Sequence, residues 1–102
     1  DDRKAMRELH RILKKTGCGI LVVPMDLNQT EIDEDPDCTD IGERWRRFGQ
    51  DDHVRKYSRA GYLARLAEAG FQVLQFQKKY FGTQAMYENA LTETATVYIV
   101  VK

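Results

Sequence analysis

One apolar run near the start of the chain constrains the fold more than any other feature. It extends from Cys18 to Asp26 and reads CGILVVPMD, with β-branched residues in its middle. Because strand side chains alternate between two faces, a continuous apolar run predicts a strand covered on both faces. Pro24 has no N–H and fits only the end of such a strand. The run therefore predicts a central strand, Ile20 to Pro24, in a parallel α/β sheet.

Three helices are predicted from apolar spacing and capping residues. Asp1 to Lys15 repeats apolar side chains at helical spacing, which predicts an amphipathic helix that Gly17 ends. Asp40 and Glu43 are spaced as in a capping box and predict a short helix after them. Ser58 is placed to cap a longer helix. One helix is thus expected before the apolar run in the sequence and two helices after it.

Two further strands are predicted in the last third of the chain. Residues 71–81 alternate imperfectly and predict a strand with a phase break, whereas residues 94–101 alternate regularly. Their short connection suits an antiparallel pair, and the helix that precedes 71–81 suits a parallel crossover. The predicted fold class is α/β, with the order helix, strand, helix, helix, strand, strand.

The composition excludes several classes of function. The chain has 102 residues, and 16 Lys and Arg balance 16 Asp and Glu, so that the formal net charge is zero. This balance lacks the positive surface typical of a protein that binds duplex nucleic acid. The longest apolar stretch, Gly19 to Met25, is too short to span a bilayer, and no signal sequence is visible. We expect a soluble, cytoplasmic protein that binds neither nucleic acid nor membrane.

The cysteine and acidic residues do not predict a metal site. Cys18 and Cys38 form no CxxC motif, which argues against a zinc cluster or a disulfide framework. The acidic segment 27–40 lacks the glycine and the terminal glutamate spacing of a calcium-binding loop. We expect no bound metal, a buried Cys18 and an exposed Cys38.

Three motifs occur in an order that one enzyme family shares. Met6 to Gly19 reads MRELHRILKKTGCG and is similar to a REL-RVLKPGG passage, with Lys15-Thr16 where proline is usual. Arg47 to Tyr57 reads RFGQDDHVRKY and is similar to a FGQ-DHVR-Y segment. Leu66 to Val73 reads LAEAGFQV and is similar to an L-EAGF-V passage. Together they resemble the C-terminal half of Rossmann-like S-adenosylmethionine-dependent methyltransferases, of the type 11/12-like class.

The resemblance implies a partial Rossmann-like methyltransferase sheet. Ile20 to Pro24 corresponds to the fifth strand, Phe71 to Tyr80 to the sixth, and Thr94 to Val101 to an antiparallel seventh strand that lies between the other two. The chain starts at Asp1, inside a helical pattern and without an initiator methionine, which is typical of a fragment. Residues 1–102 are therefore expected to be the C-terminal portion of a methyltransferase domain.

The resemblance also implies the cofactor S-adenosyl-L-methionine in the full-length family. Such a cofactor rests on a glycine-rich turn after the first strand and on an acidic residue after the second. Gly17 and Gly19 are the only close glycine pair, and they precede a strand instead of following one. We therefore expect no cofactor-binding residues in this chain and no activity from the chain alone.

Residues after the predicted strand Ile20 to Pro24 are candidates for binding the methyl acceptor. In an open α/β sheet, ligands bind beyond the carboxyl ends of the strands, where the residues 27–57 form an acceptor-side insertion or lid. The catalytic residue is unknown. The substrate-binding candidates are Asp26, His53, Arg55 and Tyr57.

Two interpretations of the insertion remain open. In the functional one, His53 accepts a proton, Arg55 holds an anionic acceptor and Tyr57 stacks on it. In the structural one, Arg55 pairs with Asp51 or Asp52, and Tyr57 packs the lid onto the sheet.

The short helix after Asp40 has an apolar stripe and a basic face. The stripe of Ile41, Trp45 and Phe48 predicts contacts with the core more strongly than a wall for a substrate. The basic side chains lie beside the acidic segment, so that we expect mutual neutralisation instead of nucleic-acid binding. These side chains are Arg44, Arg46 and Arg47.

A partial sheet has an unpaired edge. The family's fourth strand is not part of this chain, so that the edge of Ile20 to Pro24 is expected to be open to another polypeptide. We expect a homodimer through this edge. The alternative function is a stand-alone small αβ protein-interaction module that uses the same exposed edge strand. The sequence does not identify the methyl acceptor.

Overall fold

The computed structural model describes all residues, 1–102, and divides them into two compact units. One unit combines Asp1–Val22 with Leu66–Lys102, and the other is Val23–Arg65. None of the helices has the length and hydropathy needed to cross a membrane. The helices are α1 (Asp2–Ile12), α2 (Ile41–Phe48), α3 (Arg59–Glu68), α4 (Lys78–Phe81) and α5 (Thr83–Glu88). The strands are β1 (Cys18–Ile20), β2 (Asp33–Glu34), β3 (Arg55–Lys56), β4 (Gln72–Phe76) and β5 (Val97–Val101).

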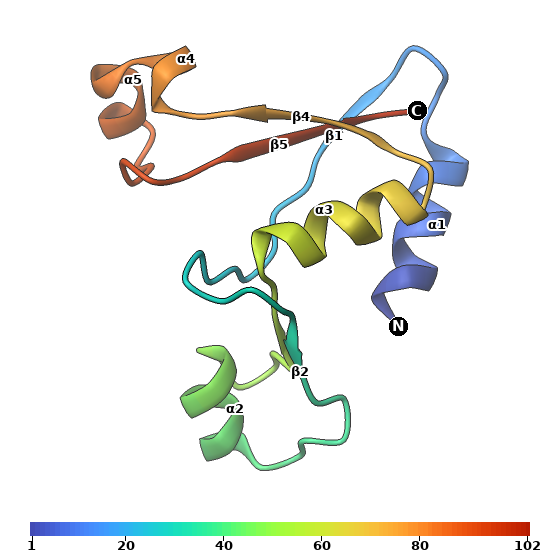
Figure 1. Cartoon of the computed structure of the whole chain (residues 1–102), viewed down its shortest axis with the longest axis vertical. Coiled ribbons are helices and arrows are strands. Elements are labelled where there is room, and N and C mark those ends of the chain that lie inside the picture. Colours follow the sequence, from blue (N-terminus) through green and yellow to red (C-terminus); the bar gives the residue numbers. More distant parts are fainter. The chain divides into compact units, whose positions relative to one another are not determined.

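The first unit contains a three-stranded sheet with its last strand in the middle. The strand order is β1-β5-β4, and β5 is antiparallel to both neighbours (Figure 1). Ile99 of β5 is opposite Ile20 on one side and Leu74 on the other. The predicted arrangement, with the last strand antiparallel and between the other two, is therefore confirmed within a mixed α/β fold. The Rossmann-like methyltransferase sheet stays a prediction.

The predicted central strand at Ile20 to Pro24 is wrong in its bounds and in its position. Strand β1 spans Cys18–Ile20 and lies at the edge of the sheet, because only β5 pairs with it. Ile20 is 64% exposed and Val22 is 88% exposed, so that the run is not covered on both faces. An apolar run indicates which residues favour a strand. Whether both faces of that strand are buried depends on helices and strands from other parts of the sequence, which the run itself does not reveal.

The two C-terminal strands are shorter than predicted. Strand β4 stops at Phe76, and the helices α4 and α5 follow where the sequence predicts more strand and a single helical turn. The ring of Phe76 packs against Tyr80, 4.6 Å away between centroids, which favours a helical turn over further extension. The N–H of Ala95 donates to the carbonyl of Thr92, so that a turn delays the start of β5.

Helix α1 forms as predicted but ends earlier. The Asp1 carboxylate accepts a hydrogen bond from the N–H of Lys4, which caps the helix. At the other end, the ammonium of Lys102 donates to the carbonyl oxygens of Arg11 and Leu13, at 3.2 and 3.0 Å. These bonds satisfy carbonyl groups that the end of a helix leaves unpaired.

Capping residues define the helices of the second unit. The Asp40 carboxylate accepts from the N–H of Glu43 at 2.7 Å, as the capping-box spacing predicts. Gly49 ends α2 in the left-handed region, at a φ of 83°, where glycine has no steric cost. The hydroxyl of Ser58 accepts from the N–H of Gly61 at 3.1 Å and caps α3. The predicted helix starts in this unit are confirmed.

Candidate functional site

The four predicted substrate-binding residues all lie in the unit Val23–Arg65. The backbone brings two of them together. The N–H of Asp26 donates to the carbonyl of Tyr57 at 2.9 Å, and the N–H of Tyr57 donates to the carbonyl of Pro24 at 2.8 Å. The Asp26 carboxylate accepts from the N–H of Asn28, at 2.9 Å, and closes a turn. Asp26 thus shapes the backbone at the start of the insertion.

Tyr57 lies in the interior. Its exposed fraction is 4%, and its ring meets that of Tyr62 edge-on, with the centroids 5.2 Å apart. The guanidinium carbons of Arg55 and Arg65 lie 5.9 and 5.8 Å from the centroid of the Tyr57 ring, within the range of cation–π contacts. The ring of Tyr57 therefore packs within its own unit, against Tyr62, and little of it is exposed for stacking on an acceptor.

Arg55 and Arg65 converge on one carboxylate, that of Glu34. The two Nη atoms of Arg65 donate to the two oxygens of Glu34 at 3.1 and 2.6 Å, and the Nε atom of Arg55 donates at 2.5 Å. The side chain of Arg65 is 8% exposed and that of Glu34 is 32% exposed. We call Glu34, Arg55 and Arg65 the Glu34 cluster. It connects strand β2, strand β3 and helix α3.

The two arginines hold the pKa of Glu34 at about 2, below its usual 4.5. The hydrogen bond from Arg65 lowers it most, burial opposes this effect, and the hydrogen bond from Arg55 lowers it further. Because the folded state binds this proton more weakly than the unfolded state does, falling pH favours unfolding. The cluster therefore contributes stability that is fully present above about pH 4.5 and is lost as the pH falls toward 2.

This lowered pKa predicts an acid-dependent loss of stability. The shift corresponds to at most about 3 kcal/mol, and we expect about 1–2 kcal/mol because a third of the side chain contacts solvent. Urea unfolding between pH 5 and pH 2 measures the loss in the wild-type protein and in Glu34→Gln. The variant should lose less stability over this interval, and equal losses would contradict the assignment.

A second ion cluster joins strand β2 to helix α2. Arg47 donates to Asp33 at 2.7 Å and to Asp35 at 2.9 Å. The hydrogen bond to Asp33 is the largest cause that raises the pKa of Arg47 above its usual value. Along the strand, Asp33 and Asp35 bind α2 while Glu34 between them binds α3, as the alternation of strand side chains requires.

The other basic side chains of α2 are also bound locally. Arg46 pairs with Glu43 at 2.7 Å, and the Nε atom of Arg44 donates to the carbonyl of Cys38, also at 2.7 Å. Carboxylates of the unit thus neutralise Arg46 and Arg47, as the sequence predicts, whereas Arg44 donates to backbone carbonyl groups.

The apolar stripe of α2 is only partly used. Phe48 is 2% exposed, whereas Ile41 and Trp45 are 60% and 57% exposed. The prediction of a core-facing stripe is therefore wrong for Ile41 and Trp45. Helical spacing places the three side chains on one face, but the unit supplies a covering element only at the end of the helix that holds Phe48.

His53 does not join the contact between Arg55 and Tyr57. Its Nδ1 atom lies 3.4 Å from the carbonyl oxygen of Phe48, and its Nε2 atom lies 3.8 Å from the carboxylate of Asp52. Arg55 and Tyr57 share a contact in which His53 takes no part. The three alternating residues thus split into a pair and a single histidine.

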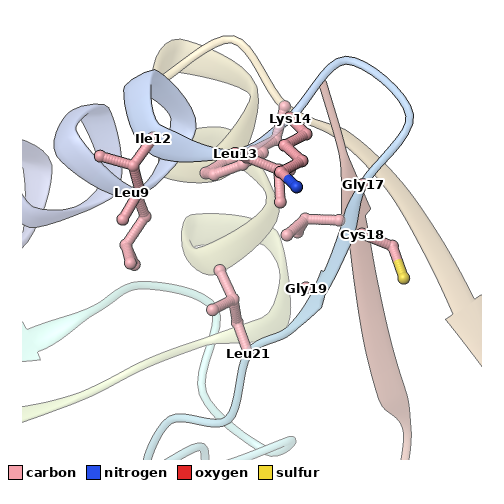
Figure 2. Close-up of a pocket in the computed structure, with 10 residues that line it drawn as sticks. Leu9, Ile12, Leu13, Lys14, Gly17, Cys18, Gly19 and Leu21 are labelled. Carbon is pink, nitrogen blue, oxygen red and sulfur yellow. The ribbon is translucent and has the colours of Figure 1, made fainter.

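The first unit contains an apolar cavity of about 400 Å³ between α1 and β1 (Figure 2). Lys14 is the one charged residue in its lining. Figure 2 shows the Cys18 sulfur on the opposite side of the strand from Leu9 and Ile12, and Cys18 is exposed, so that its predicted burial is wrong. The main lining residues are Leu9, Ile12, Leu13, Gly19, Leu21 and Val100.

Sequence reasoning missed Glu34 and Arg65. Arg65 offered a signal, because it follows Tyr62 by three residues on a predicted helix and so shares a face with a large aromatic side chain. A charge on such a face requires a partner. Glu34 offered none, because it is one of six acidic residues in segment 27–40. No group of three or more His, Cys, Asp or Glu side chains is arranged to hold a metal ion.

Comparison with protein-family models, with curated proteins and with solved structures finds no match to this chain. The resemblance to methyltransferases therefore rests on the three sequence segments alone.

Proposed function

We propose that this chain is the C-terminal part of an S-adenosyl-L-methionine-dependent methyltransferase and contributes acceptor-side elements. One observation carries the proposal: β5 is inserted antiparallel between β1 and β4, which run parallel to each other. The resemblance predicts this order for the fifth, seventh and sixth strands of such an enzyme. Most connections between sequential strands place them side by side, so that an inserted last strand is an informative agreement.

The resembling segments also begin and end at matching structural elements. Met6 to Gly19 runs from the buried part of α1 into β1, as a helix-to-strand passage should. Leu66 to Val73 runs from the end of α3 into β4. Between them Gly70 has a φ of 101°, a conformation that glycine adopts without strain. The glycine of the L-EAGF-V passage thus stands where the chain must turn.

The proposed acceptor-side chemistry uses positioning more than bond activation. Transfer of a methyl group from a sulfonium requires in-line approach of a nucleophile, and a base is needed only when the acceptor must lose a proton. His53, 26% exposed, is the proposed proton acceptor. Arg55 binds an anionic acceptor in exchange for Glu34, while Asp26 and Tyr57 hold the backbone of the insertion together.

The residues present do not fit the cofactor itself. Gly17 precedes β1 and Gly19 lies within it, so that neither forms a glycine-rich turn after a strand. Helix N-termini bind phosphate and carboxylate groups through such turns. The proposed site for S-adenosyl-L-methionine therefore lies outside the residues of this chain.

The coding sequence upstream of Asp1 tests the proposal. A strand, a glycine-rich turn and a helix encoded there should give a longer protein that binds S-adenosyl-L-methionine, whereas the 102-residue chain alone should release no heat on titration with it. A start codon directly before Asp1, or stoichiometric binding by the chain alone, would contradict the proposal.

A stand-alone protein-interaction module is the second candidate function. The exposed edge of β1 favours it, since Ile20 and Val22 are apolar and 64% and 88% exposed. A start codon at the boundary of Asp1 supports this candidate and an upstream cofactor-binding half supports the enzyme, so that one observation separates the two.

A further inference from the structure

The outer edge of β1 has free backbone groups in a regular pattern. The N–H of Leu21 donates to the carbonyl of Tyr98 at 3.2 Å, so that these two residues form a hydrogen-bonded pair of the antiparallel ladder. Such pairs alternate along the strands, and the backbone groups of Gly19 therefore also face β5. The N–H and C=O groups of Cys18, Ile20 and Val22 then point away from β5, toward the open edge.

None of the usual protection of an edge strand is present at β1. Lysine, proline and bulges in edge strands discourage pairing with other chains. Residues 16–23 carry no charge, and Pro24 comes only after the outward-facing groups. The other edge strand, β4, differs because Gln72 and Gln75 lie in it and Lys78 and Lys79 follow it.

We propose that a second copy of this chain pairs with the open edge, β1 against β1, antiparallel about a two-fold axis at Ile20. This register places Ile20 opposite Ile20 of the second copy and Cys18 opposite Val22 of the second copy. Each of these outward-facing pairs exchanges two hydrogen bonds, about six in all. The result is a continuous six-stranded sheet. The inference does not rest on the proposed function: it concerns the 102-residue chain, in which β1 is an edge strand, whereas a fourth strand supplied by the proposed full-length enzyme would occupy the same edge.

One face of the β1 segment lines the cavity, and the sizes of its side chains fit the same register. Gly19 and Leu21 share this face and both line the cavity of about 400 Å³. In the proposed register Gly19 is opposite Leu21 of the second copy, so that a large side chain lies beside a residue without one. Leu21 of the second copy therefore lies beside Gly19 and Val100 at the cavity, on the side of Leu9 and Ile12 of α1 (Figure 2).

The opposite face and the charges are also compatible with a second copy. Ile20 and Val22, both largely exposed, gain apolar neighbours across the two-fold axis. Lys14 and Lys15 precede the strand, so that antiparallel pairing places them at the opposite end of the interface from the same lysines of the second copy. A formal net charge of zero adds no repulsion between copies.

A stable dimer interface requires side chains from both faces of β1 in addition to its backbone edge. A stable interface buries about 800 Å² on each copy, more than one short strand edge supplies. Exposed apolar side chains beside the edge add to the area that pairing buries: Leu9 and Ile12, 42% and 63% exposed, on the face that lines the cavity, and Ile20 and Val22 on the other.

Sedimentation velocity over a range of concentrations tests the proposal. The wild-type chain, of 11.8 kDa, should sediment with twice that mass at high concentration. Ile20→Lys brings two ammonium groups together at the two-fold axis and should sediment as a folded monomer. Leu74→Lys, at a 48% exposed position on the other edge strand, is the matched control and should remain a dimer. A monomeric wild type, a dimeric Ile20→Lys or a monomeric Leu74→Lys would each overturn the proposal.

An engineered disulfide tests the register even if Ile20→Lys fails to fold. In a Cys38→Ser background, Val22→Cys places a thiol opposite Cys18 of the second copy, and oxidised glutathione should link the two copies covalently. The Cys38→Ser parent should not link, because Cys18 and Cys18 of the second copy lie about 13 Å apart along the strands. Failure of Val22→Cys to link, or linkage of the parent, would contradict this register.

Discussion

Glu34→Gln should lower the free energy of unfolding by about 2 kcal/mol at pH 7. The substitution keeps the shape of the side chain but removes the charge that accepts three hydrogen bonds from Arg55 and Arg65. Arg65 is 7% exposed, so that water replaces the lost carboxylate poorly. The loss stays below the value for a fully buried pair because Glu34 itself contacts solvent. Urea unfolding followed by circular dichroism measures it.

Glu31→Gln is the matched control for this prediction. Glu31 lies three residues away in the same acidic segment and takes part in no side-chain ion pair of the structure. It should change the stability by less than about 0.5 kcal/mol. Equal effects of Glu31→Gln and Glu34→Gln would show that overall charge, and not the Glu34 cluster, sets the stability.

Local signals account for what the sequence predicted correctly. Asp40 and Ser58 bond N–H groups three residues ahead, and Gly49 ends its helix in a conformation that other residues avoid. Each of these features depends on neighbours within one helical turn, which is why a single sequence reveals it. The prediction that the last strand lies between the other two was based on the resemblance to a family and not on such local signals.

Non-local contacts account for what the sequence could not predict. Ile20, Val22 and Trp45 have apolar side chains at regular spacing, yet all three are exposed because no element of their unit covers them. The partners Glu34 and Arg65 lie 31 residues apart, and any of the acidic residues nearby matches the charge of Arg65 equally well. The spacing of apolar residues identifies one face of a helix or strand. Whether that face is buried, and which charged side chains form ion pairs, depends on residues that are distant in the sequence.

Gly61→Ala should destabilise the second unit by about 1–2 kcal/mol. A Cβ atom at this position would lie 2.5 Å from the Cγ1 atom of Ile32 and 2.9 Å from the hydroxyl oxygen of Ser58. Overpacking of this kind costs about 1–3 kcal/mol, and alanine recovers up to about 1 kcal/mol of helix propensity. Gly42→Ala is the matched control, because the nearest atom to its Cβ would be 3.3 Å away, and it should be neutral or stabilising.

A double-mutant cycle with Ile32→Ala shows whether this contact causes the effect. Ile32→Ala alone removes packing from a half-buried residue and should cost about 1 kcal/mol. In the double variant the alanine at 61 meets space instead of Ile32, so that the loss from Gly61→Ala should largely disappear. The two changes should therefore couple by about 1–2 kcal/mol, measured from the four unfolding curves. Additive effects would mean that Gly61→Ala acts through the Ser58 cap or the backbone, and that helix α3 does not depend on close contact with Ile32.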